Sequence, residues 1–534
     1  GKAGGTAVLR VAKATYRAVL VPPLRTMRST TLALLEQFHE AGGTVVFAGA
    51  PASCVDALPS QAPAALARCC TAAPAQGKAL VRAVESQSRR LHIVGPSGRA
   101  IRPALHLLKE DRDAFYLFVC NTGHDFSKRG PGNDIAVRRR TASFDDVRIR
   151  GFAGCAGAPT ELDPDSGEVY RAVAERDDHG WEIRTSLPRL GSRIFVIPKR
   201  AERDRHPVRR QLEDVRRRGL GKDGWNIILS EKNGLVLDRP RFKIGSGRWR
   251  TAPDILRVDD AVRDVLGLAY RRDEFMVQPY ARQRAARPRC VDVALDYSFN
   301  VQTVTSGDLF LGLERPETFR ISLNGTPVSV DAECGWWCDR SLRTVPLDPG
   351  LLRLGTNRIK LRCDYDENHS GLEMAYLLGT FGVQIDGAEV TMTALPRQLR
   401  IGDWCGQGLP FYSGSVSYVK TVRPRLAAGQ RLFVQVPGYA GMGVCVRVGG
   451  REAGIIGWEP NEVDITDFVN GDPIELQLQV IGHRRNSHGP LHLSDSSPIV
   501  TGPDEFVSEG DRWVDSYQLA PCGLISEPHL VVRR

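Results

Sequence analysis

The sequence predicts a mainly β protein with an α/β region at its amino end, and three observations point to this fold class. Apolar residues alternate with others from Val444 to Val448 and from Ile474 to Val480, with glycine-containing turns between these runs. Alternation is the period of a half-buried strand, and paired glycines permit tight antiparallel turns. A similar set of runs lies about 125 residues earlier. Near the amino end, a helical pattern precedes a wholly apolar run, which is typical of a parallel α/β unit.

The length of 534 residues exceeds one domain, since about 150 residues per domain is usual. A hydrophobic content of 42% and a charged content of 25% are ordinary for globular chains, so sizeable cores are possible. Changes of pattern predict five segments in this order: an α/β domain at 1–95, a small β-sandwich at 96–200, a connecting region at 201–290, and two further β-sandwiches at 291–390 and 391–534.

The formal net charge is +10, and basic residues cluster at Lys199–Arg218 and Arg282–Arg289. Such blocks are read either as a polyanion-binding surface or as solvated linker. The linker is favoured because neither block carries the interleaved aromatics of a nucleic-acid module, so no nucleic-acid partner is expected. No run of about 18 apolar residues occurs, and we therefore predict no membrane span.

The chain begins with Gly1 and enters a predicted strand at Ala7–Val11 almost at once. We therefore expect it to be the carboxyl-terminal portion of a longer protein. The compartment stays open, with an extracellular or periplasmic location favoured if the parent protein carries a signal peptide.

The first segment combines a short strand at Ala18–Val21, an amphipathic helix at Arg28–Gly42 and a parallel-type strand at Thr44–Ala48. The helix has one apolar face, formed by Leu32, Leu35 and Phe38. The stretch from Thr15 to Ser53 resembles the class I amidotransferase-like domain that follows the catalytic barrel in glycoside hydrolase families 42 and 106. The resemblance implies a structural domain without amidotransferase chemistry.

The second segment contains a predicted strand at Phe115–Cys120, a polar turn at Glu161–Gly167 and a terminal strand within Leu187–Ile197. These three phrases resemble the small β-sandwich that follows the amidotransferase-like domain in the same enzymes. The connecting region then holds an apolar, alternating stretch at Asn226–Asp238 and a predicted helix at Ile255–Gly267, with Leu256, Val262 and Leu266 on one face.

The last two segments carry related patterns of strand, tight turn, aromatic loop and strand. In the later copy, Gly449-Gly450 forms the turn and Trp458 begins the loop; in the earlier copy, Asn324-Gly325 forms the turn and Trp336-Trp337 the loop, followed by alternating Ile359, Leu361 and Cys363. Both copies resemble the galactose-binding-like jelly rolls of family 2 sugar-binding domains and of family 106 α-L-rhamnosidases. The resemblance implies two such jelly rolls, and it covers nearly the whole chain in one domain order.

Carbohydrate is the partner that this resemblance implies. Aromatic rings stack on the apolar faces of sugars, while carboxylate, amide and imidazole groups bind hydroxyls. The alternative is that the tryptophans only plug the sandwich edges. The predicted carbohydrate-binding residues are Trp336, Trp337 and Asp339 at the first aromatic loop and Trp458, Glu459 and Asn461 at the second. Tyr412, His488 and His492 are expected near the second loop and complete the set.

No metal ligand or cofactor is assigned. Asp163, Asp165 and Glu168 are read as a polar hairpin turn, since the spacing of a calcium loop is missing. Cys334 and Cys338 flank the tryptophan pair. They are read as free thiols, with a disulfide bridge or half of a metal site as the alternatives, and the chain has no two CxxC pairs that would indicate structural zinc. A structural calcium ion is common in the resembled fold, but the sequence does not indicate its ligands.

Glycoside hydrolysis needs two carboxylates about 5 to 10 Å apart on a rigid scaffold. In the resembled enzymes these lie on a (β/α)₈ barrel, and about 250 residues of alternating strand and helix are not found here. Two acid groups are tempting, Glu333 with Asp339 and the set Asp364, Asp366 and Glu367, but both are read as turn and rim acids. No catalytic residue is predicted.

These observations lead to two hypotheses. In the first, the chain is the accessory carboxyl-terminal portion of a glycoside hydrolase that resembles α-L-rhamnosidases and acts on plant or microbial polysaccharide, and its partner is the catalytic barrel of the same parent chain. In the second, the chain is a stand-alone carbohydrate-binding or adhesion protein without catalysis.

Overall fold

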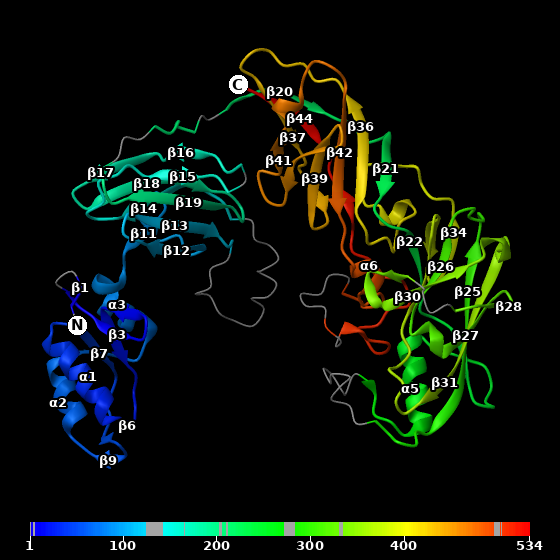
Figure 1. Cartoon of the computed structure of the whole chain (residues 1–534), viewed down its shortest axis with the longest axis horizontal. Coiled ribbons are helices and arrows are strands. Elements are labelled where there is room, and N and C mark those ends of the chain that lie inside the picture. Colours follow the sequence, from blue (N-terminus) through cyan, green and yellow to red (C-terminus); the bar gives the residue numbers. More distant parts are fainter. Residues whose placement is uncertain are drawn as a thin grey trace. The chain divides into compact units, whose positions relative to one another are not determined.

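The computed structural model describes residues 2–3, 6–123, 142–164, 166–201, 205–209, 212–271, 284–330, 335–495, 502 and 505–534. These residues form two compact units, one up to Arg209 and one from Leu212 onward. Strands outnumber helices in the described residues, and the protein is mainly β, as predicted (Figure 1).

The first unit begins with a three-stranded parallel sheet in the order β10-β7-β5, packed with helices. Its elements are β5 (Ala18–Val21), α1 (Ser29–Glu40), β7 (Thr44–Ala48), α2 (Ala62–Cys69), β10 (Thr71–Ala73) and α3 (Gly77–Ser88). The α/β character, the parallel strand at Thr44–Ala48 and the helix that precedes it are confirmed. Three antiparallel or mixed pairings complete this region, formed by β1 (Lys2–Ala3), β2 (Thr6–Ala7), β3 (Leu9–Val11), β4 (Ala14–Tyr16), β6 (Thr26–Met27), β8 (Cys54–Val55) and β9 (Leu58–Pro59).

Helix α1 buries Leu32, Leu35 and Phe38, which is the predicted apolar face. After the helix, Gly42 adopts a φ of +86°, and a Cβ at Gly43 would lie 2.3 Å from the Phe38 ring. The two glycines therefore end the helix and let the chain pass close to its apolar face.

The strand predicted at Ala7–Val11 is divided in the structure. β2 ends at Ala7 and pairs with β1, whereas β3 begins at Leu9 and pairs with β4. Ala12 has a φ of 51°, which turns β3 back on itself into a hairpin. Two local hairpins thus replace one longer strand.

A small sandwich of two antiparallel sheets completes the first unit. One sheet has the order β11-β14-β18-β17 and the other β12-β13-β19-β15-β16. The strands are β11 (Leu91–Val94), β12 (Ala104–Glu110), β13 (Ala114–Asn121), β14 (Phe144–Gly151), β15 (Thr160–Leu162), β16 (Val169–Arg171), β17 (Ala174–Asp177), β18 (Gly180–Leu187) and β19 (Ser192–Pro198). Side chains from both sheets meet in one core, including the fully buried Leu117, Val147, Ile183 and Phe195.

Two sequence predictions on this sandwich are refined. The phrase Leu187–Ile197 contains the end of β18, a turn and then β19, because Leu190 adopts a φ of 54°. The turn at Glu161–Gly167 joins β15 to β16, and the main-chain N–H of Gly167 donates to Asp163 O. It is therefore a hairpin, as predicted; Asp165 lies outside the described residues.

The second unit contains two sandwiches. The first, called the middle sandwich, has the sheets β22-β32-β26-β30-β29 and β24-β23-β25-β31-β27-β28, with β33 and β34 attached to the latter. Its elements are β22 (Asn233–Leu237), β23 (Arg241–Ile244), β24 (Arg250–Thr251), α5 (Ile255–Leu266), β25 (Cys290–Val301), β26 (Leu309–Glu314), β27 (Phe319–Leu323), β28 (Thr326–Val328), β29 (Trp336–Trp337), β30 (Asp339–Leu347), β31 (Gly355–Asp366), β32 (Ala375–Gly379), β33 (Gly382–Asp386) and β34 (Glu389–Thr393).

The other sandwich of this unit, called the terminal sandwich, has the sheets β20-β44-β37-β41 and β35-β21-β36-β42-β39-β40. Its elements are β20 (Asp214–Gly219), β21 (Trp225–Leu229), β35 (Gln398–Leu399), β36 (Val416–Val422), β37 (Arg431–Gln435), β38 (Tyr439–Ala440), β39 (Gly443–Val448), β40 (Arg451–Ile456), β41 (Glu462–Asp464), β42 (Ile474–Ile481), α6 (Arg485–His488), β43 (Gly523–Leu524) and β44 (His529–Arg533). Short 3₁₀ turns lie at Pro316–Thr318, Pro349–Leu351, Cys405–Gln407 and Thr466–Phe468.

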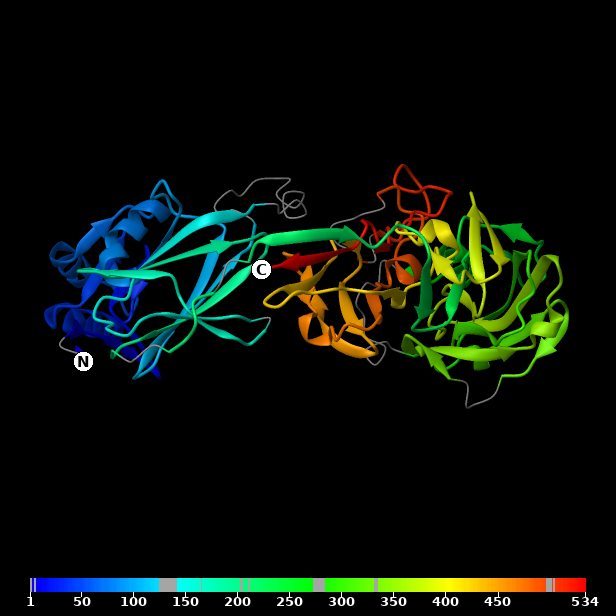
Figure 2. The ribbon, with the colours of Figure 1, turned by 90° about the horizontal axis from the view of Figure 1, so that it is seen from above.

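Residues 201–290 contribute strands to both sandwiches. β20 pairs with β44, and β21 pairs with β36, so the start of this stretch belongs to the terminal sandwich. β22 and β23 pair within the middle sandwich. The middle sandwich is therefore inserted between two strands of the terminal one, and the chain after α6 lies between the two (Figures 1 and 2).

Local patterns in this unit follow the sequence closely. Asn324 and Gly325 have φ values of 51° and 89°, and Gly449 and Gly450 have 56° and 78°, so both predicted turns exist. Helix α5 buries Val262 and Leu266 as predicted, but Leu256 is half-buried, and Ile255 and Val258 take the inner positions instead. None of the described helices has the length and apolar character needed to cross a membrane.

Candidate carbohydrate-binding site

The first aromatic loop exposes one tryptophan and buries the next. Trp336 is 57% exposed and Trp337 is 7% exposed, because adjacent residues of the short strand β29 point to opposite faces. Asp339 follows in β30 and is exposed; its Oδ1 accepts hydrogen bonds from the N–H and hydroxyl of Ser341, both at 2.7 Å. These bonds hold the pKa of Asp339 below its usual value, so an exposed carboxylate follows three residues after the exposed indole.

The buried tryptophan belongs to an aromatic cluster of Trp337, Tyr376 and His488. The Trp337 ring centroid lies 5.1 Å from that of Tyr376 and 5.2 Å from that of His488, and the Arg484 guanidinium lies 5.5 Å from the Trp337 ring centroid. His488 was expected near the second aromatic loop, but α6 carries it to the first one. The sequence pattern does not predict this position, because His488 lies 150 residues after Cys338, which it contacts at the first loop.

His488 and Cys338 approach each other without forming a nucleophilic pair. Cys338 Sγ lies 3.2 Å from His488 Nε2, and Ser487 Oγ lies 2.6 Å from Nδ1. Burial, and then the charge of Arg484, lower the pKa of His488 to about 4, while burial raises the pKa of the Cys338 thiol. Both groups are therefore neutral at pH 7, and the pair lacks the thiolate that nucleophilic catalysis requires.

Tyr412 is a buried structural residue. It is 1% exposed; its hydroxyl accepts from the main-chain N–H of Ser230 at 2.9 Å and donates to Ser415 O at 3.0 Å. Beside it, Arg484 donates to both oxygens of Glu231, at 2.5 and 2.8 Å. The tyrosine thus fixes the loop that carries Glu231 and offers no surface to a sugar.

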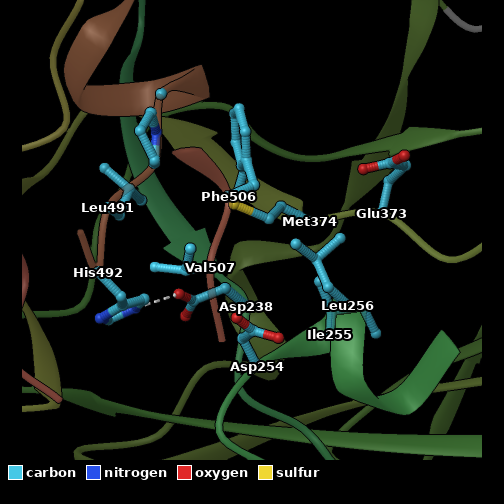
Figure 3. A pocket seen from close by; sticks show the side chains of 12 residues that line it. Asp238, Asp254, Ile255, Leu256, Glu373, Met374, Leu491, His492, Phe506 and Val507 are labelled. Carbon is cyan, nitrogen blue, oxygen red and sulfur yellow. Dashed lines mark hydrogen bonds and ion pairs between the residues drawn. The ribbon is translucent and has the colours of Figure 1, made fainter. Parts of the chain in front are cut away.

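His492 lines a small pocket in which apolar side chains surround a few acidic ones (Figure 3). It is 5% exposed, and its Nε2 hydrogen-bonds Oδ2 of the buried Asp238 at 2.9 Å, while the hydroxyl of Tyr517 donates to Oδ1 at 2.9 Å. The cavity measures about 50 Å³ and is also lined by Asp254. Sugar and drug-sized sites usually measure about 300 Å³ or more, so this pocket is too small for a pyranose.

Asp254 has a structural task in the same pocket. Its Oδ1 accepts from the main-chain N–H of Arg257 at 3.1 Å and caps the amino end of α5. Burial raises the pKa of Asp254, against hydrogen bonds from Ser508 and Arg257 that lower it. Since both oxygens of Asp238 and one oxygen of Asp254 are already engaged, this pair of carboxylates supports the fold.

The second aromatic loop joins β40 to β41 and exposes Trp458, which is 54% exposed. Asn461 closes the loop: its N–H donates to Trp458 O at 3.0 Å, and its own carbonyl accepts from the N–H of Val436 at 2.9 Å. Glu459 is half-buried within the same turn. As predicted from the repeat, each exposed tryptophan follows a tight hairpin in its own sandwich.

The acids read as turn and rim residues behave in that way. Asp364 pairs with Arg320 at 3.3 Å, Asp366 accepts from the N–H of Asn368 at 2.8 Å, and Glu367 pairs with Arg289 at 2.5 Å. Glu333 lies outside the described residues. Among the described residues, no three histidine, cysteine or acidic side chains are grouped as metal ligands.

One exposed tryptophan is not among the predicted contacts. Trp249 is 39% exposed and precedes β24, in a stretch assigned only to the connecting region. Its indole lies 5.6 Å from the Arg241 guanidinium. In the sequence, the exposure of this tryptophan is indicated only by the phrase GRWRT, in which arginines flank it on both sides.

No family model matches the chain, and neither does any curated protein. Among solved structures, a rhamnosidase from Novosphingobium sp. PP1Y superposes over 99% of this chain and 34% of its own, with a TM-score of 0.46 and 12% identity. An α-L-rhamnosidase from Streptomyces avermitilis, complexed with L-rhamnose, covers 73% of this chain and 37% of its own, with a TM-score of 0.21 and 11% identity.

A β-D-mannosidase from Dictyoglomus thermophilum covers 49% of this chain and 32% of its own, with a TM-score of 0.18 and 11% identity. This chain thus spans about a third of the length of the rhamnosidase and mannosidase chains that it matches. The similarity to these glycoside hydrolases is coarse.

The two adjacent tryptophans lead to opposite expectations for stability. Trp337→Ala removes a buried ring from the aromatic cluster and is expected to lower the free energy of unfolding by about 3 to 5 kcal/mol. Trp336→Ala is the matched control and should change it by less than about 0.5 kcal/mol. Urea unfolding of the full chain measures both; equal effects would contradict the different burial of the two rings.

Asp254→Asn tests the raised pKa of the capping carboxylate. The folded state holds this proton more tightly than the unfolded chain, so the penalty for ionisation appears as pH rises from the unfolded pKa through the folded one. Asparagine keeps the cap but carries no charge. The midpoint of thermal unfolding should therefore rise at pH 7.5 and match the wild type near pH 3, while Asp348→Asn, which changes an exposed capping aspartate, should show no such difference.

Proposed function

We propose that this chain is the accessory, carbohydrate-binding portion of a larger glycoside hydrolase that resembles α-L-rhamnosidases. One observation carries the proposal: the two sandwiches of the second unit expose tryptophan. Trp336 and Trp458 are more than half exposed, whereas Trp225 and Trp404 are completely buried in the same unit. An indole left in water gives up the free energy of burial, so its exposure favours a ligand that stacks on it.

The surroundings of these two indoles suit a sugar. Pyranose rings present apolar C–H faces to an aromatic ring and hydroxyls to polar neighbours. Asp339 lies three residues from Trp336 and has one carboxylate oxygen, Oδ2, without a hydrogen-bond partner among the described residues. Glu459 and Asn461 are the corresponding polar neighbours of Trp458.

The remaining predicted residues support these loops instead of touching the sugar. Trp337 and His488 hold the first loop against α6, and Tyr412 and His492 are buried within the second unit. The proposal therefore keeps Trp336, Asp339, Trp458, Glu459 and Asn461 as carbohydrate contacts. It also includes the amidotransferase-like and galactose-binding-like identities of the domains.

The accessory role is supported by an apolar sheet face in the first unit. The strand registers place four apolar residues in one row across this sheet: Leu107 of β12, Phe118 of β13, Ile194 of β19 and Leu162 of β15. Leu107 is 55% exposed and Phe118 is 38% exposed, and the opposite face of this sheet already forms the core of the small sandwich. A sheet with apolar residues on both faces needs a covering partner. We assign this face to the rest of the parent protein, including its catalytic barrel.

Carbohydrate binding is tested by affinity electrophoresis of the full chain in gels that contain a neutral, L-rhamnose-rich polysaccharide. Loss of one stacking contact should weaken retardation by about 3- to 10-fold in Trp336→Ala or Trp458→Ala, and further in the double variant. The control is Leu354→Ala, which removes an exposed apolar side chain at a turn. Phe310→Ala is not used as the control because Lys232 lies over that ring.

Retardation that is unchanged in the double variant would contradict the assignment of the two loops. Incubation with an aryl α-L-rhamnoside tests the accessory role separately. The chain alone should release no phenol. Robust turnover would contradict the accessory role, because it would mean that this chain carries the catalytic residues itself.

The apolar sheet face predicts a measurable surface property. Leu107→Lys combined with Phe118→Lys should lower the fluorescence of a hydrophobic dye and reduce association of the chain at micromolar concentration, because both side chains are exposed and leave the core intact. Leu58→Lys alters one leucine that is 71% exposed elsewhere in the unit and is the control. Equal effects of the two variants would argue against a docking face.

A further inference from the structure

A groove of about 350 Å³ lies on the outward face of one sheet of the middle sandwich. Its walls and floor come from β25, β27 and β31 and from the turn before β24, with Trp249, Ala294, Arg320, Ser322, Lys360 and Arg362 contributing. The alternate residues of these strands, such as Leu295 and Leu361, face the core. The groove is therefore built on rigid strands and is separate from the two aromatic loops.

The register explains why this face is hollow. Arg362 lies between Ala294 of β25 and Arg320 of β27, and Lys360 of the same strand lies opposite Ser322 of β27. Ala294 and Ser322 are short, while the three basic side chains are long. Short residues next to long ones leave a trough with cationic walls, and Trp249 contributes an aromatic surface to it.

The charges in the groove are only partly paired. Arg362 Nε lies 2.5 Å from Asp292 Oδ1, and Arg320 lies 3.3 Å from Asp364 and 3.6 Å from Asp292. Both arginine side chains are about 60% exposed, so these ion pairs contribute little and leave N–H groups for a ligand. Lys360 lies opposite Asp296 of β25, but that carboxylate pairs with Arg358, and Lys360 itself forms no ion pair among the described residues. The groove thus holds a surplus of positive charge.

Trp249 offers a stacking surface beside this charge. One of its neighbours, Arg241, lies 5.6 Å from the indole. Arg241 is opposite Asp296 in the pairing of β23 with β25, but it forms no ion pair in the described part of the chain. Single-stranded nucleic acid is usually bound by several aromatics along a track, each stacking one base. One indole beside three cationic side chains and a serine hydroxyl suits a sugar ring that carries an anionic group.

We propose that this groove binds an acidic saccharide chain, with a sugar ring against Trp249 and a carboxylate or sulfate group on Lys360, Arg320 and Arg362. The proposal rests on the carbohydrate-binding function proposed above, but it uses different residues and a different class of sugar. Guanidinium and ammonium groups bind both anions well, so carboxylate and sulfate are treated as one chemistry at this site.

Affinity electrophoresis of the full chain tests the groove with three polysaccharides: polygalacturonate for carboxylate, dextran sulfate for sulfate, and dextran as the neutral reference. Trp249→Ala and Lys360→Glu should each weaken binding to an acidic polysaccharide by about tenfold at 0.1 M salt, and neither should matter for dextran. Whichever acidic polymer shows the tryptophan-dependent loss identifies the anion. Lys222→Glu makes the same charge change at an exposed site of the terminal sandwich and should have little effect.

Trp336→Ala with Trp458→Ala separates the two proposals. If the double variant no longer binds the neutral rhamnose-rich polymer but still binds the acidic one, the loops and the groove are independent sites. If it still binds both polymers, the assignment of the loops is wrong, and the assignment of the groove is unaffected.

Three results would overturn the proposal that the groove binds an acidic saccharide. The first is an equal loss of binding in Lys360→Glu and Lys222→Glu, which would indicate an effect of net charge alone. The others are no loss of binding in Trp249→Ala, or the same dependence on the tryptophan for single-stranded DNA, which would indicate a nucleic acid ligand. All these substitutions are at exposed positions, and circular dichroism checks that each variant folds.

Discussion

The buried carboxylate of Asp238 anchors the carboxyl-terminal segment onto the middle sandwich. It is 3% exposed, and it accepts hydrogen bonds from His492 and Tyr517, which lie more than 250 residues further along the chain. A buried charge is costly unless it is fully hydrogen-bonded, so this segment must return to the same place in the folded protein. The neighbouring aromatic cluster and the Arg484–Glu231 pair depend on the same placement of α6 and the chain that follows it.

This anchor explains why so many predicted ligand residues are buried. α6 leaves β42 of the terminal sandwich and enters the junction with the middle sandwich, where the Tyr376 hydroxyl donates to Ser487 O at 2.9 Å. Histidine and tyrosine are suited to such a junction because each combines a flat apolar ring with a hydrogen-bonding edge. The same chemistry makes these residues good sugar contacts, and composition alone does not distinguish the two uses.

Local features were predictable, and long-range neighbours were not. Alternation located β31 and β42, glycine pairs located the hairpin turns, and the helical period located α1, because each depends on residues a few positions apart. The partners of His488 and His492 depend on how distant strands pair, which the sequence pattern does not encode. The insertion of the middle sandwich between β21 and β35 was hidden for the same reason: the two strands pair across more than 170 residues.

Among the candidate contacts, the tryptophan pair shows the limit of residue type most directly. Trp336 and Trp337 are identical in chemistry and adjacent in sequence, yet only one of them is available to a ligand. In a strand, neighbouring side chains must point to opposite faces, so a pair predicts one buried and one exposed ring. Which ring is buried depends on the position of α6, and the sequence pattern therefore leaves that choice open.

The positions of charged residues also depend on long-range strand pairing. The first basic block is used within the fold: Lys199 pairs with Glu110, Arg209 with Asp163, and Arg216 lies on β20, a fully exposed edge strand whose charges discourage strand addition. The cations of the groove belong to neither block. Lys360 and Arg362 alternate on β31, and Arg320 of β27 becomes their neighbour only through the pairing of β27 with β31. The groove is therefore not marked by a block of consecutive arginines: cross-strand pairing brings Arg320 beside the alternating Lys360 and Arg362, next to an exposed indole.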